Sequence, residues 1–261
     1  MPKPNVTEVK VTAIPAFADN YIWLISTGGT LCAVVDPGDD APVRRVLDRE
    51  GLELAYILLT HHHADHIGGA AALADVTGAE VCGPHDSRIP HRQRSVGEGD
   101  TVELPRLGLR FEVLEVPGHT TSHIAFVGHG CLFCGDTLFS VGCGRLFEGT
   151  PAQMQASLDK LAALPPATSV YCGHEYTVAN CAFALEVEPA NDDLQRRARA
   201  AESARSAGRI TLPSTLGEEL AVNPFLRSRQ PAVVEAARRR DPAAEPGAST
   251  LAAIRAWKDT Y

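Results

Sequence analysis

The 261-residue sequence lacks the features typical of nucleic-acid-binding, membrane-spanning and secreted proteins. It has no basic excess: 24 Lys and Arg face 32 Asp and Glu, and the formal net charge of −8 argues against a nucleic-acid-binding surface. Its longest uncharged apolar runs reach about half of the ~20 residues that a transmembrane helix needs. The segment from Met1 to Glu8 also lacks the apolar core of a secretory signal. We therefore expect a cytoplasmic protein that binds neither nucleic acid nor membranes.

The seven cysteines form neither a disulfide framework nor a zinc-knuckle pattern. Their number is odd, and the Cys131-x-x-Cys134 pair has no second pair at zinc-site spacing. That pair lies in an apolar alternation typical of a buried strand, so we interpret the cysteines as reduced thiols. The sequence also lacks a Gly-x-Ser-x-Gly motif, which argues against a serine nucleophile of the α/β-hydrolase type.

Strand and helix signals alternate along the first part of the chain. β-rich runs bounded by turn residues predict strands over 6–11, 21–25, 31–36, 55–60, 79–82, 110–116, 123–127, 131–135 and 168–172. Helical spacing of apolar residues predicts helices over 41–50, 68–77 and 151–163. This alternation is the α/β pattern.

After about residue 174 the strand-like alternation stops. Helical patterns follow over 176–187, 191–207, 230–240 and 249–261. Thr215 and Glu218 have the spacing of a capping box, and Ser249 is the expected N-cap of the last helix. We therefore predict a catalytic domain over residues 1–174 and a smaller all-α domain over residues 175–261.

Four of the ten histidines fall within six residues, in the run Thr60-His61-His62-His63-Ala64-Asp65-His66. The run follows a predicted strand and precedes two glycines, which is the edge of an α/β sheet where ligands bind. A single histidine in such a loop is more often a solvated side chain. Here imidazole and carboxylate are combined, as in the nitrogen and oxygen ligand sets of zinc. The run therefore predicts a metal site, with His62 pointing away from it.

Three further residues of ligand type follow apolar β runs and border glycines: His119, Asp136 and His174. Together with His61, His63, Asp65 and His66 of the run they give five His and two Asp, more than the four ligands of one tetrahedral zinc. We therefore predict two ions bridged by Asp136. The first ion is expected to bind His61, His63 and His119, and the second Asp65, His66 and His174. Of the remaining histidines, His123 is the candidate for contact with a ligand.

The spacing Thr-His-x-His-x-Asp-His, with the later His and Asp residues, resembles the signature of the metallo-β-lactamase superfamily, whose fold is an αββα sandwich. Other segments are similar to the glyoxalase II (hydroxyacylglutathione hydrolase) family over essentially the whole chain: AlaPheAlaAspAsnTyr (16–21), GlyCysGlyArgLeuPheGluGly (142–149), TyrCysGlyHisGluTyrThr (171–177), AsnProPheLeuArg (223–227) and ArgAlaTrpLysAsp (255–259). The resemblance implies such a sandwich followed by a helical domain that helps to hold glutathione.

This resemblance also implies an activity. The reaction would be hydrolysis of S-(2-hydroxyacyl)glutathione, chiefly S-D-lactoylglutathione, to glutathione and D-lactate by a metal-bridging hydroxide, the second step of methylglyoxal detoxification. Asp65 and Asp136 would be the catalytic carboxylates beside two divalent ions, zinc first, with iron or manganese as alternatives. The substrate-binding positions of the family fall on Arg145, Phe147, Tyr176, Arg255 and Lys258. Some members carry Lys and Tyr in place of Arg145 and Phe147, so a phenolic hydroxyl is missing here.

Two alternatives remain open from the sequence. A mononuclear-iron persulfide dioxygenase has a similar histidine run, but that family resembles this chain only in the first domain. A non-catalytic metal- or glutathione-binding module is the second alternative. The expected partner is a small glutathione thioester, and the expected assembly is a monomer, with an oligomer left open.

Overall fold

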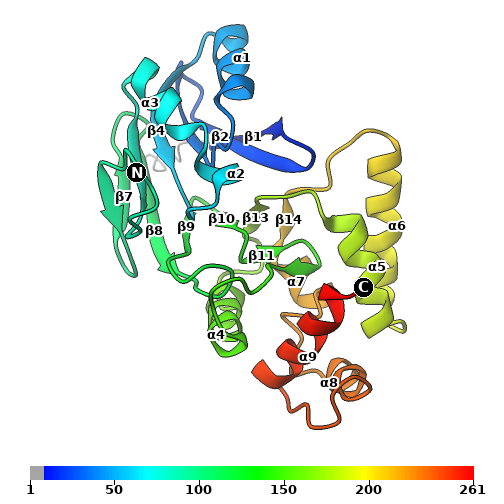
Figure 1. Cartoon of the computed structure of the whole chain (residues 1–261). Helices are drawn as coiled ribbons and strands as arrows, with labels where there is room; N and C mark the ends of the chain where they lie inside the picture. Colours follow the sequence, from blue (N-terminus) through cyan, green and yellow to red (C-terminus); the bar gives the residue numbers. More distant parts are fainter. Residues whose placement is uncertain (1–8) are drawn as a thin grey trace, which may run out of the picture. The chain divides into compact units, whose positions relative to one another are not determined.

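The computed structural model describes residues 9–261, which form two compact units (Figure 1). The first unit runs to Leu114 and also contains Ile124–His129. The second unit contains Glu115–His123 and Gly130–Tyr261. The predicted boundary between residues 174 and 175 refers to functional domains rather than to these units, and it stays a prediction.

The first unit contains a six-stranded sheet with the order β1-β2-β3-β4-β5-β6. Its strands are β1 (Lys10–Ala16), β2 (Asn20–Ser26), β3 (Leu31–Val35), β4 (Glu53–Leu58), β5 (Glu80–Pro84) and β6 (Arg94–Val96). Strands β1 to β3 are antiparallel, and β3 to β6 are parallel. Strand β2 is buried along its whole length, which explains why its sequence is almost continuously apolar.

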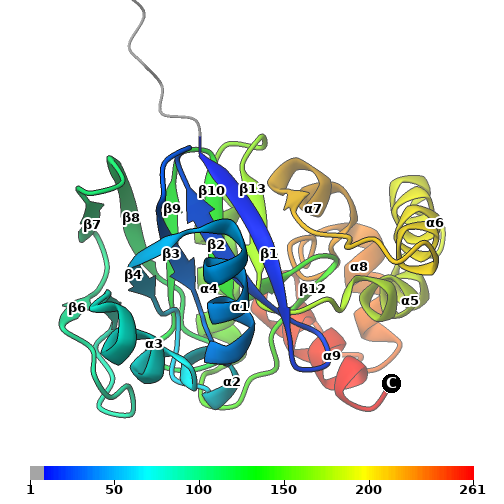
Figure 2. The ribbon, with the colours of Figure 1, turned by 90° about the horizontal axis from the view of Figure 1, so that it is seen from above.

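Two helices of the first unit pack on this sheet (Figure 2). The helices of the unit are α1 (Asp40–Glu50), α2 (Ala64–Ile67) and α3 (Ala70–Thr77). Helix α1 begins where the Asp39 carboxylate accepts a hydrogen bond of 2.9 Å from the Ala41 N–H, and it ends at Gly51, whose φ is 63°. The apolar residues of α1 and α3 share one buried cluster with β3 and β4. Burial of each large side chain stabilises the unit by about 1.5–3 kcal/mol.

The first unit also contains the strands β7 (Thr101–Leu104) and β9 (Ile124–Gly128), and all of β8 (Leu109–Glu115) except its last residue. Strands β7 and β8 pair antiparallel. Most of β8 alternates buried and exposed residues, as a strand with one covered face should.

The second unit combines short strands with most of the helices. Strand β10 (Cys131–Gly135) pairs parallel with β13 (Ser169–Cys172), and β13 pairs antiparallel with β14 (Ser214–Thr215). A separate antiparallel pair is formed by β11 (Leu138–Phe139) and β12 (Gly142–Cys143).

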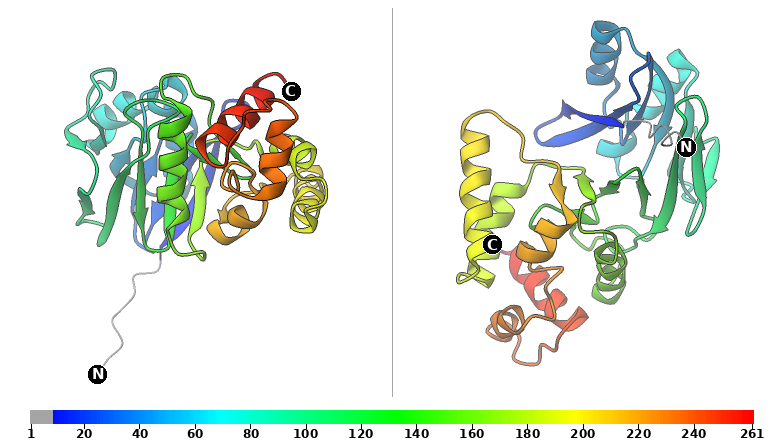
Figure 3. Two further views of the ribbon diagram at one scale, coloured as in Figure 1. Left: turned by 90° about the horizontal axis from the view of Figure 1, so that it is seen from below. Right: turned by 180° about the vertical axis from the view of Figure 1, so that it is seen from behind.

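The helices of the second unit pack on one another, α5 on α6 and α8 on α9 (Figure 3). They are α4 (Pro151–Ala162), α5 (Thr177–Val187), α6 (Asp192–Ser206), α7 (Leu216–Val222), α8 (Pro231–Arg238) and α9 (Ala248–Asp259). The predicted capping box at Thr215 and Glu218 is confirmed at the start of α7. Among the helices of residues 9–261, none is long and apolar enough to cross a bilayer.

Some predicted elements differ from the structure. The strand predicted over 6–11 overlaps β1 only at Lys10 and Val11, and residues 6–8 lie outside the described part of the chain. The N-cap predicted at Ser249 is wrong, because α9 begins at Ala248 after Gly247. The predictions also miss the short elements α2, β6, β7, β11, β12 and β14, and of α7 they give only the capping box at its start.

Candidate metal centre and substrate pocket

The histidine run lies in the loop that leaves β4 and in helix α2, within the first unit. His61 and His66 are almost completely buried, His63 is partly buried, and the side chain of Asp65 is 42% exposed. The loop fits closely against the segment after β3, because a Cβ atom added to Gly38 would overlap the carbonyl of Asp65. Glycine at this position thus allows the two loops to approach each other.

The buried carboxylate of Asp36, at the end of β3, orients this run. Its Oδ1 accepts a hydrogen bond of 2.8 Å from the Thr60 N–H, and its Oδ2 accepts one of 2.6 Å from the Thr60 hydroxyl. The Nδ1–H of His66 donates to the same Oδ2 at 3.0 Å. Because Nδ1 carries the proton, Nε2 of His66 has a lone pair, which is directed toward Asp65 Oδ2 at 3.5 Å.

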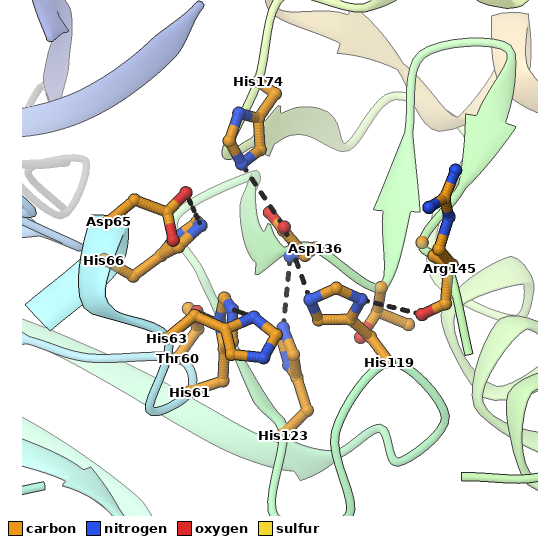
Figure 4. A network of polar contacts seen from close by, with 12 residues as sticks. Thr60, His61, His63, Asp65, His66, His119, His123, Asp136, Arg145 and His174 are labelled. Atoms are coloured by element: carbon orange, nitrogen blue, oxygen red, sulfur yellow. Dashed lines mark hydrogen bonds and ion pairs between the residues drawn. The ribbon is translucent and has the colours of Figure 1, made fainter. Parts of the chain in front are cut away.

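The same carboxylate acts on His61 through Thr60. The Thr60 hydroxyl gives its only proton to Asp36, so its oxygen accepts from Nδ1–H of His61 at 3.0 Å. Nε2 of His61 is then the atom with a lone pair, and it lies 3.2 Å from Nδ1 of His63 (Figure 4). Donor atoms of Asp36, His61 and His66 lie within 4.8 Å of one another, but the Asp36 oxygens already accept three hydrogen bonds. Asp36 therefore orients the predicted ligands His61 and His66 and is not itself assigned as a ligand.

Asp65 is held by a residue from β2. Asn20, which is buried, donates through Nδ2 to Asp65 Oδ2 at 3.0 Å. This contact fixes a carboxylate that would otherwise turn freely at the surface. His62 points elsewhere: its Nδ1 lies 3.5 Å from Asp86 Oδ2.

The second unit brings together His119, Asp136 and His174, which are all buried. Nε2 of His119 lies 3.5 Å and Nε2 of His174 lies 3.3 Å from the same Asp136 oxygen, Oδ2 (Figure 4). Nδ1–H of His119 donates to the carbonyl of Arg145 at 2.8 Å, which leaves a lone pair on its Nε2. The Asp136 N–H donates to Nε2 of His123 at 3.1 Å, so His123 contacts a predicted ligand.

These donor sets fit divalent metal ions. In each unit a neutral imidazole directs its Nε2 lone pair toward a carboxylate oxygen, from His66 to Asp65 and from His119 to Asp136. Two acceptors facing each other repel unless a proton or a cation lies between them. The histidine and carboxylate donors are those that zinc and similar ions prefer. The His and Asp residues therefore form a metal-binding cluster suited to divalent ions.

The five residues predicted to bind substrate line one pocket of about 460 Å³ within the second unit. His119 and Asp136 line the same pocket. Arg145 and Phe147 are largely exposed, and the ring centre of Phe147 lies 5.3 Å from that of His119. The ring of Tyr176 stacks on His174 at 4.8 Å between centres. The pocket thus joins predicted metal ligands to predicted substrate contacts.

Helix α9 supplies two of the three cationic groups of this pocket. The guanidinium of Arg255 is buried and donates to the carbonyl of Cys143 at 2.9 Å and to Asp259 Oδ1 at 3.1 Å. Asp259 Oδ1 also lies 3.1 Å from Nε of Arg145, so one carboxylate oxygen is shared by two guanidinium groups.

The third cation, Lys258, is partly buried, and its Nζ donates to Asn180 Oδ1. Burial, and then the charge of Arg255, lower the pKa of Lys258 to about 8. The ammonium also lies 5.8 Å from the ring centres of Phe183 and Phe225. This lysine is therefore charged at neutral pH but close to losing its proton.

Four residues that contact the predicted metal ligands or the predicted substrate-binding residues were not predicted from the sequence: Asn20, Asp36, Asn180 and Asp259. A signal for Asp36 was present, because it follows an apolar strand and precedes Pro37 and Gly38, as Asp136 follows β10 and Gly135. Asn20 lies in one of the segments that carry the family resemblance. Asp259 also lies in such a segment, at residues 255–259, whereas nothing local in the sequence singles out Asn180.

Comparisons with known proteins cover nearly the whole chain. A family model described as "Metallo-beta-lactamase superfamily" matches residues 17–174, and one described as "Hydroxyacylglutathione hydrolase C-terminus" matches residues 175–261. A curated relative from Ectopseudomonas mendocina (strain ymp), named "Hydroxyacylglutathione hydrolase", is 52% identical, and the match covers 97% of this chain and 100% of the relative.

Solved structures support the same fold. The crystal structure of ETHE1 from Myxococcus xanthus matches with a TM-score of 0.65 and 26% identity, covering 97% of this chain and 99% of that one. The crystal structure of TTHA1623 in a di-iron-bound form matches with a TM-score of 0.58 and 27% identity, covering 83% and 99%. The predicted metallo-β-lactamase fold with a helical C-terminal region is confirmed. The chain belongs to the hydroxyacylglutathione hydrolase, or glyoxalase II, family of the metallo-β-lactamase superfamily.

Proposed function

We propose that the chain hydrolyses the thioester bond of S-(2-hydroxyacyl)glutathione, chiefly S-D-lactoylglutathione, to give glutathione and D-lactate. The observation that carries the proposal is the pocket of the second unit, in which Arg145, Arg255 and Lys258 line the same cavity as His119 and Asp136. Relatives that share about half of the sequence and bear the name of this activity support it.

We propose two divalent ions as cofactors, zinc in the first place and iron or manganese as alternatives. One would be held by His61, His63 and His119, the other by Asp65, His66 and His174, with Asp136 as the bridge. When bound, such ions polarise the thioester carbonyl and lower the pKa of water from 15.7 to ~7. The contacts of Asp136 support its bridging role, because the two histidines assigned to different ions approach the same oxygen.

The catalytic roles of Asp65 and Asp136 follow from this assignment. Asn20 fixes the Asp65 carboxylate through its Nδ2, and the Asp136 N–H is held by His123. The Asp65 carboxylate is thus oriented before substrate arrives, which lowers the reorganisation needed during the reaction, and His123 fixes the backbone at Asp136.

The cationic groups of the pocket suit glutathione, which carries two carboxylates. Arg255 and Lys258 lie three residues apart on α9 and can bind one anion together. Arg145, at 57% exposure, can reach a second part of the ligand. Tyr176 and Phe147 provide apolar ring surface in the same pocket.

The leaving group of the proposed reaction, the glutathione thiolate, does not need to be protonated by the protein. A cysteine thiol has a pKa near ~8.5, so the thiolate departs without a general acid. No residue of the pocket therefore needs to protonate the sulfur atom. An amide would require such a residue, which is why we propose thioesters rather than amides as substrates.

We further propose that residues 1–174 form the catalytic domain and residues 175–261 the substrate-binding domain. All seven cysteines are buried free thiols, which supports a reducing compartment, and we propose a cytoplasmic location. A monomer is the expected assembly, which light scattering on a sizing column would test.

The proposal is tested by steady-state hydrolysis of S-D-lactoylglutathione with protein of known metal content. We expect turnover that depends on close to two ions per chain. A matched thioester without glutathione, S-D-lactoyl-N-acetylcysteamine, should react with much lower kcat/KM because it lacks both carboxylates. Equal turnover of the two thioesters would contradict glutathione recognition. One bound iron with oxygen consumption on glutathione persulfide would favour the dioxygenase instead.

A further inference from the structure

The turn between β11 and β12 has a strained backbone. Val141 is completely buried, and its φ of 58° lies in the left-handed region. A β-branched residue rarely adopts this conformation, because its side chain then crowds the backbone. Such a conformation persists only where surrounding groups hold it.

A buried carboxylate from another helix holds this residue. Glu219 on α7 is completely buried, and its Oε2 accepts a hydrogen bond of 2.7 Å from the Val141 N–H. The same oxygen accepts one of 3.1 Å from Nδ2 of Asn223. A carboxylate is costly to bury, so packing alone would favour an apolar side chain at this position. The hydrogen bond to the turn gives a reason for a glutamate here.

The carbonyl groups of the turn are held as well. Nδ2 of Asn223, at the end of α7, donates to the carbonyls of Phe139 and Gly142 at 3.1 and 3.0 Å. Nδ2 of Asn180, on α5, donates to the carbonyl of Ser140 at 2.9 Å. Each of the four residues 139–142 of the turn therefore has a hydrogen bond to a side chain on α5, on α7 or at the end of α7.

The turn in its present shape places two groups at the substrate pocket. The ring centre of Phe139 lies 5.9 Å from that of His174 and 5.2 Å from that of Tyr176. On the other strand, the carbonyl of Cys143 accepts the hydrogen bond from Arg255. The pairing of Leu138 with Cys143 across the turn keeps these two positions in register.

We propose that Glu219 is a positioning residue of the substrate pocket: by holding Val141 in its left-handed conformation, it keeps Phe139 and the Cys143 carbonyl in place for substrate. This inference rests on the proposed function, because its effect is on the binding of the glutathione thioester. Glu219 touches neither substrate nor metal ligand in this role. It acts through the turn, about 80 residues earlier in the chain.

The test compares three variants with the wild type in S-D-lactoylglutathione hydrolysis. Glu219→Met keeps the volume and removes the acceptor, and we expect KM to rise about tenfold with kcat changed less than about threefold. Glu219→Gln keeps an acceptor oxygen, so its KM should stay within about twofold of wild type. Adding Val141→Gly to Glu219→Met should restore KM to within about threefold, because glycine adopts this φ without strain.

The rescue separates positioning from general stability. Leu161→Ala, a buried truncation on α4, is the matched control: it should lower Tm without raising KM. An unchanged KM in Glu219→Met, or a double variant that binds as weakly as the single one, would overturn the proposal. If Glu219→Met alone does not fold, the double variant decides: near-wild-type KM supports the proposal and failure to fold overturns it.

The failure of the inference can be told apart from the failure of the proposed function. A wild-type protein without thioesterase activity would refute the function. Calorimetric titration with glutathione then gives the same comparison of variants without turnover. Equal affinity of the wild type and Glu219→Met for glutathione, or no binding by the wild type, would overturn the inference.

Discussion

Replacement of Asp36 by asparagine should weaken metal binding although Asp36 is not itself a proposed ligand. The amide can keep its oxygen on the Thr60 N–H, but its NH2 group then faces the Thr60 hydroxyl and Nδ1 of His66, where the carboxylate accepts at 2.6 and 3.0 Å. Nδ1 of His66 must become an acceptor. The Thr60 hydroxyl in turn gives its proton to Nδ1 of His61. Both histidines then carry their proton on Nε2, which blocks that atom as a ligand.

The size of the effect follows from the number of ligands disturbed. Loss of a group that orients a metal ligand typically costs 10–100-fold in metal affinity, or about 1.4–2.7 kcal/mol. Since two histidines change, we expect a loss at the upper end of that range for Asp36→Asn. The assay is competition with a chelator, with metal content measured by mass spectrometry and folding checked by circular dichroism.

Asp39→Asn is the matched control, because it makes the same chemical change three residues later. Asp39 caps α1, and asparagine is an equally good cap, so metal affinity and stability should stay unchanged. If Asp36→Asn binds metal within about twofold of the wild type, the orientation of these imidazoles does not depend on the Asp36 carboxylate.

Four further predictions concern the pocket. Asp136→Ala should abolish hydrolysis and lower metal content while the circular dichroism spectrum remains that of a folded chain; normal turnover would exclude Asp136 as the bridge. Lys258→Ala should raise KM about tenfold and lower kcat less, since a hydrogen bond to a charged group contributes about 1.5–3 kcal/mol, and an unchanged KM would make Lys258 a bystander. The pKa of Lys258 is lowered to about 8, so the ammonium deprotonates as pH increases from 7 to 9, and the wild-type KM should rise over this range. Lys258→Arg should keep a constant KM, because the guanidinium stays charged. A wild-type KM that does not change with pH would contradict this prediction. Phe147→Tyr should leave Tm unchanged, since the ring is 61% exposed, and lower KM by at most about tenfold through one added hydrogen bond; a large loss of stability would contradict its placement.

The proposed metal ligands were accessible from sequence because the histidine run follows an apolar strand, and because His119, Asp136 and His174 each follow an apolar β run and border a glycine. Asp36 also directly follows an apolar strand, but an aspartate before Pro37 and Gly38 is equally typical of an ordinary turn. Its contacts lie 24 and 30 residues away, at Thr60 and His66. One sequence does not encode which distant side chain a carboxylate will meet, so its orienting role emerges only in the fold.

Local chemistry also explains which elements were predicted. The starts of α1 and α7 have caps whose partners lie within three residues, and the capping box of α7 was predicted from the sequence. Ser249 has the right chemistry for a cap, but its hydroxyl accepts from the Glu245 N–H at 3.2 Å, in the turn before α9. Strands β11 and β12 have two residues each, too few to show a period of two. They are held by α7, which lies some 80 residues later.

The carboxylate of Asp259 gives the pocket an anion of its own. Arg145 and Arg255 share its Oδ1, so one of their two positive charges is already balanced before any ligand arrives. An incoming carboxylate of the proposed substrate therefore exchanges with an internal anion, or joins it beside guanidinium groups that are already half neutralised. Such an exchange limits the net gain in affinity, and it lets the internal carboxylate take back the guanidinium groups as the product departs. We therefore expect the pocket to release its ligand more readily than a pocket whose guanidinium groups have no internal carboxylate partner.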